Sequence, residues 1–181
     1  MSDRADDILC GGVGLALFYT SATSDDSWYD KLFDERRIVF GPTVLLYHRS
    51  QCDLTLFVRH MTLHLDLTAA ELVTANVLYE SFLRANQHIT ASLPCVRLLM
   101  TACISLASKT LTDAVLTTNL IAAIVDNSGF QLDKKQLGRM EIAILKKLDY
   151  RIIRPPEVYL CYVNELTKLY DPLAIPPHLG M

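Results

Sequence analysis

The stretch that decides the fold is residues 93–109, which read LPCVRLLMTACISLASK. From its start to Ala107 the sole charged side chain is Arg97, so apolar or small residues face every direction around the expected helix. A helix that is hydrophobic all round, yet too short to cross a membrane, lies in the middle of a bundle. The stretch therefore predicts an all-α fold in which one central helix is wrapped by four others.

Helical patterns flank this central helix on both sides. Apolar residues recur at helical spacing from 54 to 65, and Thr68 with Glu71 has the spacing of a capping box. Asp133 and Gln136 repeat that spacing before another amphipathic run. The expected helices are 53–65, 68–84, 92–109, 117–126, 133–148 and 155–170, followed by a proline-containing arm.

Three regions are expected along the chain: an N-terminal extension at 1–52, the main helical domain at 53–153, and a last helix with its tail at 154–181. Small and polar residues cluster at 11–14 and 20–27, which predicts loops. The glycines at 11–14 lack the lysine of a phosphate-binding loop, so we expect a flexible turn there. Trp28, Leu32 and Phe33 share a helical face that is expected to dock on the main domain.

Composition and charge exclude several classes of protein. The net charge of −3 and the pI near 5.9 leave no electrostatic footprint for nucleic acid. No apolar run approaches the roughly 20 residues of a membrane span, and the N-terminus is acidic where a secretory signal is basic. Five cysteines without CxxC spacing indicate reduced thiols. We therefore expect an intracellular protein, in the nucleus, the cytoplasm or both.

Motifs for catalysis or metal binding are weak. His60 and His64 stand four residues apart, a spacing that can bind zinc, but further ligands are not apparent. The sequence holds no Gly-x-Ser-x-Gly and no cysteine with an arranged histidine. We expect no metal, no cofactor and no catalytic activity.

Two charged residues stand at unusual places in the helical pattern. On the expected fifth helix an inward stripe is formed by Leu137, Ile144 and Leu148, and Glu141 falls in its middle. A carboxylate there must be paired, or must sit where the stripe emerges at the surface. Lys109 closes the central helix, where a cation complements the helix dipole. From the pattern alone, an internal salt bridge and a contact with a partner are equally open for Glu141.

The segments around these two charges resemble the signature helices of the cyclin box. Residues 98–109 (LLMTACISLASK) are similar to its third helix, in which a leucine stands eleven residues before a lysine that follows Leu-Ala-Ser. Residues 140–150 (MEIAILKKLDY) resemble its fifth helix, and Val58 with Arg59 stands where the first helix carries Met-Arg. The similarity extends over residues 53–165 and implies a single five-helix cyclin box at 53–153.

The resemblance implies a regulatory subunit that binds and activates a cyclin-dependent protein kinase. In cyclins the lysine and glutamate that match Lys109 and Glu141 hydrogen-bond backbone groups of the kinase near its mobile helix. Leu145 and Tyr150, with Ile142 beside them, match apolar residues that bury against that helix. The charged contacts set orientation, and the burial supplies most of the binding energy. The kinase then shifts towards its active arrangement.

Subfamily features are mixed. Asp113, with Asn119 after it, resembles the P-type cyclins linked to phosphate signalling, as do residues 150–153. Asp126 and Asn127 instead resemble mitotic cyclins. Asp113 is a candidate partner for a kinase arginine, with a solvated loop acid as the plainer alternative.

Two further sets of residues match family positions with changes. The family joins its first-helix arginine to an aspartate on the second helix, and here Arg59 is matched by Glu80, so the pair is expected to persist with adjusted geometry. Many cell-cycle cyclins recruit substrates through Met, Leu and Trp on the first helix. Val58, Thr62 and Leu65 stand there instead, so that docking mode is not expected.

Three classes of function remain open. The first, which the resemblance favours, is a kinase-activating cyclin whose partner is a cyclin-dependent protein kinase, with no nucleic acid and no membrane. The second is a cyclin-fold scaffold or adaptor that binds a partner without activating a kinase. The third is a transcription-factor-type cyclin fold that binds DNA, which the net negative charge of the chain disfavours.

Overall fold

The computed structural model describes residues 7–22, 30–34, 51–87, 90–112, 118–127 and 132–169, without the side chains of 51–53, 118 and 125–127. Trp28, Asp113, Thr117 and the proline-containing arm lie outside the described residues. Within these ranges the fold is all-α, as predicted. The helices are α1 (Asp7–Tyr19), α2 (Gln51–Leu65), α3 (Ala69–Ala85), α4 (Leu93–Leu111), α5 (Thr118–Asn127), α6 (Lys134–Lys147) and α7 (Pro156–Leu169).

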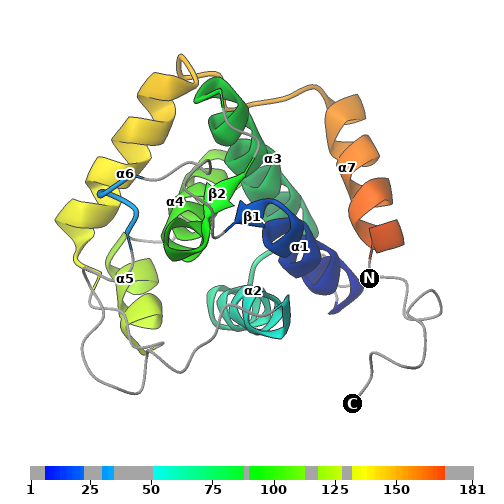
Figure 1. The fold of residues 1–181 in the computed structure, drawn as a ribbon, viewed down its shortest axis with the longest axis horizontal. Coiled ribbons are helices and arrows are strands. Elements are labelled where there is room, and N and C mark those ends of the chain that lie inside the picture. Colours follow the sequence, from blue (N-terminus) through cyan, green and yellow to red (C-terminus); the bar gives the residue numbers. More distant parts are fainter. Residues whose placement is uncertain are drawn as a thin grey trace.

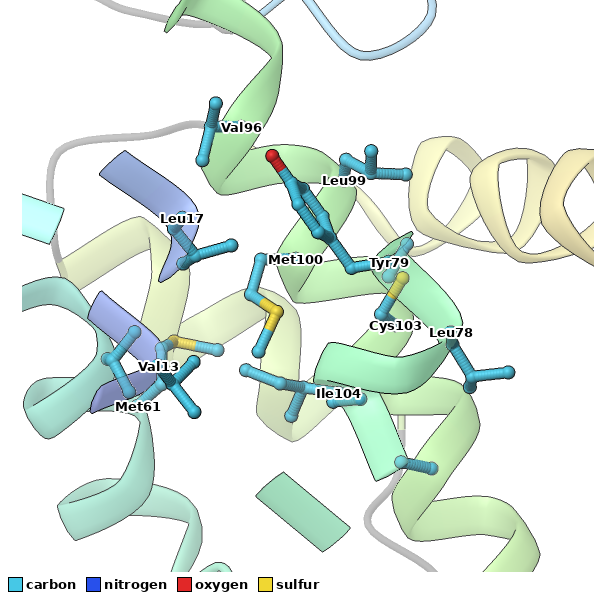
Figure 2. Packing of buried hydrophobic residues seen from close by; sticks show 14 of the residues in the cluster. Val13, Leu17, Met61, Leu78, Tyr79, Val96, Leu99, Met100, Cys103 and Ile104 are labelled. Carbon is cyan, nitrogen blue, oxygen red and sulfur yellow. The ribbon is translucent and has the colours of Figure 1, made fainter. Parts of the chain in front are cut away.

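Helix α4 runs through the middle of the molecule, and α3, α5 and α6 pack against it (Figure 1). Every residue from Cys95 to Ser108 is buried, which leaves the helix no solvent-facing side along that length. Figure 2 shows part of the core around it, where side chains of α1, α2, α3 and α4 interleave. The predicted central buried helix is confirmed.

Helix starts follow the predicted capping residues. Thr68 Oγ1 accepts a hydrogen bond from the Glu71 backbone N–H at 3.2 Å, and Glu71 Oε2 accepts one from the Thr68 N–H at 2.8 Å, a complete capping box. Asp133 Oδ1 accepts from the backbone N–H groups of Lys135 and Gln136 at 2.6 and 2.9 Å. Since these bonds satisfy amides that lack partners within the helix, α3 and α6 begin beside the expected residues.

The N-terminal residues depart from the prediction. Instead of a flexible turn at 11–14, α1 is a continuous helix whose central residues are buried. A Cβ added to Gly12 would lie 2.1 Å from the Leu166 carbonyl oxygen, and one on Gly14 would lie 2.5 Å from Thr55 Cα. The glycines therefore allow α1 to pack closely between α2 and α7 (Figure 1). The predicted turn is wrong because this packing outweighs the low helix propensity of glycine.

A short parallel strand pair fastens the end of α1 to the start of the central helix. Strand β1 (Ser21–Ala22) pairs with β2 (Ala91–Ser92), and the Ala91 N–H donates to the Thr20 carbonyl at 2.8 Å. The pairing places α1 next to α4, although more than sixty residues separate them in the chain.

Leu32 and Phe33 lie in a turn, not on the helical face that the sequence predicted. The Leu32 N–H donates to Asp30 Oδ1 at 2.8 Å, a side-chain bond that competes with helix formation. Phe33 is fully buried, and its ring centroid lies 5.7 Å from that of Phe82 on α3. The segment thus packs on the main domain through one aromatic side chain.

Helix α7 lies along α1 and α3 (Figure 1). Its buried residue is Leu166, and Tyr159 and Tyr162 are half-buried against the core. The helix therefore closes one side of the fold with a narrow apolar strip. No helix in the described part of the chain combines the length and apolar character needed to cross a bilayer.

Candidate functional site

Lys109 and Glu141 meet where α4 and α6 reach the surface. Lys109 Nζ lies 2.6 Å from Glu141 Oε1, and Ser105 Oγ donates a hydrogen bond to the same oxygen. Ser105 precedes Lys109 by one helical turn, so both donors come from one side of α4. The side chain of Lys109 is 28% exposed and that of Glu141 is 12% exposed. The pair is therefore neither a closed core ion pair nor a fully solvated one.

The carboxylate of Glu141 keeps capacity for a further contact. Both hydrogen bonds that it accepts from described residues end on Oε1, and none of those residues donates to Oε2. A carboxylate has about four acceptor sites on its two oxygens. An N–H donor placed against Oε2 can therefore be bound while the pair with Lys109 stays closed. Ser105 was missed in the sequence, although its spacing of four residues before Lys109 signals a shared face.

Large apolar side chains lie next to this pair. Leu145, one turn after Glu141, is half-buried and packs against the core, whereas Ile142 is 50% and Tyr150 64% exposed. The Tyr150 N–H donates to the Leu145 carbonyl at 2.8 Å, which holds the tyrosine just beyond the end of α6. The structure thus brings Lys109 and Glu141 together. Leu145 lies one turn along α6 from Glu141, its carbonyl is bonded to the Tyr150 N–H, and Ile142 lies on the neighbouring face of the helix.

The chain changes direction sharply at Tyr150. Asp149 and Tyr150 have φ values of 50° and 58°, so two consecutive non-glycine residues occupy the left-handed region. Such residues persist only where surrounding contacts hold them. The Arg151 N–H donates to the Leu148 carbonyl at 2.9 Å, which closes the turn and sends the chain towards α7.

An apolar groove of about 240 Å³ opens beside the site, between α3, the end of α4 and the start of α7. Its lining includes Thr110, the residue after Lys109, and Ile152, two residues after Tyr150. The groove is lined by Ala70, Thr74, Val77, Thr110, Leu111, Ile152, Ile153, Arg154, Pro156 and Tyr159. The sequence did not predict it, because its walls come from segments that are far apart in the chain.

A second buried carboxylate anchors the end of α4. Glu71 of α3 accepts hydrogen bonds from Thr112 Oγ1 at 2.7 Å and from the N–H and Oγ1 of Thr68 at 2.8 and 2.7 Å. Burial raises the pKa of Glu71, but these hydrogen bonds outweigh it and hold the pKa below the ordinary value. Glu71 therefore ties the start of α3 to the end of α4, three residues after Lys109.

The expected ion pair between Arg59 and Glu80 is replaced by two separate contacts. Arg59 Nε lies 3.4 Å from Asp7 Oδ1 on α1. Glu80 Oε2 lies 3.0 Å from Arg84 Nη2 and accepts a hydrogen bond from the Tyr162 hydroxyl of α7 at 2.7 Å. Burial, together with the Glu80 carboxylate, raises the pKa of Tyr162 to about 12. The flanking helices supply these partners, which the pattern within the main domain did not reveal.

The positions that match the substrate-docking residues of cell-cycle cyclins are covered in this protein. Val58, Thr62 and Leu65 of α2 are all buried, and the Cys10 thiol of α1 lies 3.5 Å from Thr62 Oγ1. Helix α1 packs along α2 over this region (Figure 1). These three side chains therefore form part of the interior and offer no docking surface.

His60 and His64 lie one turn apart on α2, with ring centroids 4.3 Å from each other. Burial, with the neighbouring His64, lowers the pKa of His60. In the described ranges, no three His, Cys, Asp or Glu side chains are grouped so that they could hold a metal ion. The two histidine rings thus contact each other on one face of α2 at a tilted angle of 54°.

The all-α fold around one central helix defines a class of helical-bundle domains. Within that class, the chain matches the family described as "Cyclin, N-terminal domain" over residues 44–153, which is more than half of its length. The protein therefore belongs to the cyclin family, and α2 to α6 lie within the matched residues. Members of this family are regulators without catalytic activity of their own. No curated protein and no solved structure matches the chain significantly.

Proposed function

We propose that this protein is the regulatory subunit of a cyclin-dependent protein kinase, which it activates by positioning the mobile helix of the kinase. The observation that carries the proposal is the Lys109–Glu141 pair, which is partly exposed beside large apolar side chains. An exposed apolar cluster around an ordered charged pair is the arrangement expected of a protein-binding surface. Membership of the cyclin family makes a kinase the expected partner.

Binding would combine two contributions. Glu141 Oε2 accepts a backbone N–H of the kinase, while Lys109 donates to a backbone carbonyl, and these charge-assisted bonds set the orientation. Leu145, Tyr150 and Ile142 bury against the kinase helix and supply most of the free energy. The apolar groove, whose lining includes Thr110, would extend this surface towards α7.

Activation follows from a difference in affinity for two states of the kinase. A partner that binds the active position of the mobile helix more tightly than the inactive one shifts the population towards the active state. A shift from 1% to 99% active needs a difference of about 5.5 kcal/mol. A few well-buried apolar anchors reach this range, whereas exposed ion pairs alone do not.

The test is a pull-down of kinase from a lysate of the source cells, followed by binding and activity assays with the kinase so identified. Lys109→Ala and Glu141→Ala are each expected to weaken binding by roughly tenfold to a hundredfold. Lys168→Ala and Glu165→Ala provide the matched control, because that exposed pair on α7 has the same chemistry at 3.1 Å. Unchanged kinase binding in both site variants would refute the proposal.

A scaffold without kinase activation is the alternative, and one observation favours it. Lys109, Glu141 and Ser105 already satisfy one another, as a purely structural network that fixes the packing of α4 on α6 would. Phosphotransfer by the kinase, measured with and without the protein, separates the two functions. Binding without a rise in phosphotransfer supports the scaffold.

The finer assignments remain predictions. The mixture of P-type and mitotic features leaves the cell-cycle and nutrient-signalling roles both open. Asp113 is proposed as a partner for a kinase arginine, and it lies outside the described residues. Asp113→Asn is expected to lower kinase activation without changing the folding of the free protein.

A further inference from the structure

The positive charge of the chain is concentrated in one segment. Residues 133–154 hold seven lysine and arginine residues against three aspartate and glutamate residues, a net charge of +4. The whole chain carries −3, so the remainder carries −7. A cationic region on an otherwise acidic protein is an electrostatic feature that a partner can recognise.

Part of this charge forms a continuous stripe on α6. Lys135, Arg139, Ile142 and Lys146 follow one another at i, i+4, i+7 and i+11, the spacing of a single helix face, and all four are exposed. We call these four residues the basic stripe. Gly138 lies on the same face, and a Cβ at that position would meet no atom within 4 Å. The stripe is thus an exposed row of three cations around one exposed apolar side chain.

The described residues do not neutralise the basic stripe. No carboxylate among them forms an ion pair within 4 Å of Lys135, Arg139 or Lys146. The pKa of Asp133 is lowered mainly by the hydrogen bond from the Gln136 backbone N–H, and less by that from the Lys135 N–H and by the charges of Arg139 and Lys135, so its Oδ1 is engaged at the start of α6. As far as the described part of the chain goes, the three cations are therefore available to an external anion.

The basic stripe faces away from the candidate kinase contact. At 100° per residue, its cations lie about 120° to 160° around the axis of α6 from Glu141. Helix α6 forms an edge of the molecule (Figure 1). A kinase bound at Lys109 and Glu141 would leave this side of the helix accessible, and Ile142 would stand at the border between the two surfaces.

We propose that the basic stripe docks an acidic peptide segment of a partner other than the kinase, with acidic residues on both sides of an apolar one. The stripe is about 16 Å long, which matches about five residues of extended chain. Its cations stand on both sides of Ile142, which fits the acidic–apolar–acidic order. The charge of −7 on the rest of the chain opposes nucleic acid, which would extend beyond the stripe. This docking does not depend on the proposed kinase contact.

The experiment measures the fluorescence anisotropy of a labelled peptide, Gly-Ser-Glu-Glu-Leu-Glu-Glu-Ser-Gly, titrated with the full chain. Arg139→Glu and Ile142→Ala are each expected to weaken binding by about fivefold to tenfold. Lys147→Glu is the matched control, because it reverses the same charge on the same helix but outside the stripe, and a change below about threefold is expected. Circular dichroism of each variant verifies that the helices are intact.

Two additional arms define the ligand. A second peptide carries phosphoserine in place of each glutamate. Tighter binding of this peptide would indicate a phosphorylated partner segment, and tighter binding of the glutamate peptide an unphosphorylated acidic one. Either result supports docking at the basic stripe. A titration with the kinase already bound should keep the contribution of the three cations and lose that of Ile142, which the kinase contact buries. A weakening no larger than that of Ile142→Ala therefore supports a surface whose cations are separate from the kinase contact. Loss of peptide binding in the kinase complex would overturn that separation.

Other outcomes would overturn the proposal itself. An equal loss in Arg139→Glu and Lys147→Glu would mean that the peptide responds to overall charge. The absence of peptide binding at about 50 mM salt, where screening is weak, would also overturn it. Tighter binding of single-stranded RNA, with the same sensitivity to Arg139→Glu, would assign the surface to nucleic acid instead. The kinase-binding assays with Lys109→Ala are read separately, so the two hypotheses can fail independently.

Discussion

At the scale of single residues, two carboxylates hold the end of the central helix in place. Glu141 receives Lys109 and Ser105 from one side, and Glu71 receives Thr112 from the other. Both carboxylates lie where α4 leaves the core, and their hydrogen bonds compensate for the loss of water around them. The position of Lys109, and with it the candidate kinase contact, therefore depends on side chains of α3 and α6.

Glu71→Gln is expected to lower the free energy of unfolding by about 1 to 3 kcal/mol at neutral pH, because charge-assisted hydrogen bonds become neutral ones. The pKa of Glu71 is lower in the folded state, so its stabilisation is present above the unfolded value near 4.5 and is lost as pH falls through the folded value. Urea unfolding between neutral and acidic pH should show a smaller loss of stability on acidification in Glu71→Gln than in the wild type.

Glu165→Gln is the control for that measurement, since Glu165 is an exposed acid on α7 whose partner Lys168 is also exposed. Its unfolding free energy should stay within about 0.5 kcal/mol of the wild type. If Glu71→Gln and the wild type lost stability in parallel as the pH fell, the stabilising role of the Glu71 carboxylate would be disproved.

At the scale of secondary-structure elements, two helical glycines differ in the space available for a side chain. In α1, Gly12 has no space for a side chain, because the backbone of α7 occupies the place of its Cβ. In α6, Gly138 faces open space. The first glycine permits a close packing of helices, whereas the second only lowers helix propensity.

The matched substitutions Gly12→Ala and Gly138→Ala should shift stability in opposite directions. Gly12→Ala is expected to cost about 1 to 3 kcal/mol or more, because α1 must move away from α7 to admit the methyl group. Gly138→Ala is expected to gain roughly 0.5 to 1 kcal/mol from helix propensity alone. Thermal unfolding followed by circular dichroism compares the two, and stabilisation by both substitutions would contradict the close contact at Gly12.

At the scale of the whole molecule, the flanking helices complete the cyclin-family domain. Helix α1 covers Val58, Thr62 and Leu65 and provides Asp7 as a partner for Arg59. Helix α7 meets α1 at Gly12 and hydrogen-bonds α3 through Tyr162. The core therefore extends beyond the five helices α2 to α6, and a surface that recruits substrates in cell-cycle cyclins becomes interior.

A chain that begins at residue 23, and so lacks α1 and β1, is expected to lose cooperative unfolding. Four large aliphatic side chains of α1 are buried, and each contributes roughly 1.5 to 3 kcal/mol, a sum comparable to the entire stability of a domain. The buried aliphatic residues are Leu9, Val13, Leu15 and Leu17. Thermal and urea unfolding monitored by tryptophan fluorescence and circular dichroism provide the measurement.

Single substitutions in the full chain give the matched comparison. Leu17→Ala should cost about 2 to 5 kcal/mol, because Leu17 is fully buried. Ile8→Ala on the same helix should cost less than about 1 kcal/mol, because Ile8 is exposed. If the shortened chain unfolded cooperatively at an unchanged midpoint, α1 would not contribute to the stability of the domain. The face of α2 that α1 covers would then be a candidate docking surface.

The sequence by itself determined the central helix and the need of Glu141 for a partner or a surface position, whereas only the tertiary structure decided that Lys109 and Ser105 are its partners. Residues 93–109 are apolar on nearly every side of the helix, a pattern that only a core position satisfies. A glutamate within an apolar stripe needs either a partner or a position where the stripe reaches the surface. These inferences succeeded because they rest on periodicity and capping, which are local properties. The tertiary structure alone decided the remainder. The conformation of Gly12, the partners of Arg59 and Glu80, and the groove beside Thr110 depend on where α1 and α7 lie, and contacts between distant segments leave no periodic trace in the chain.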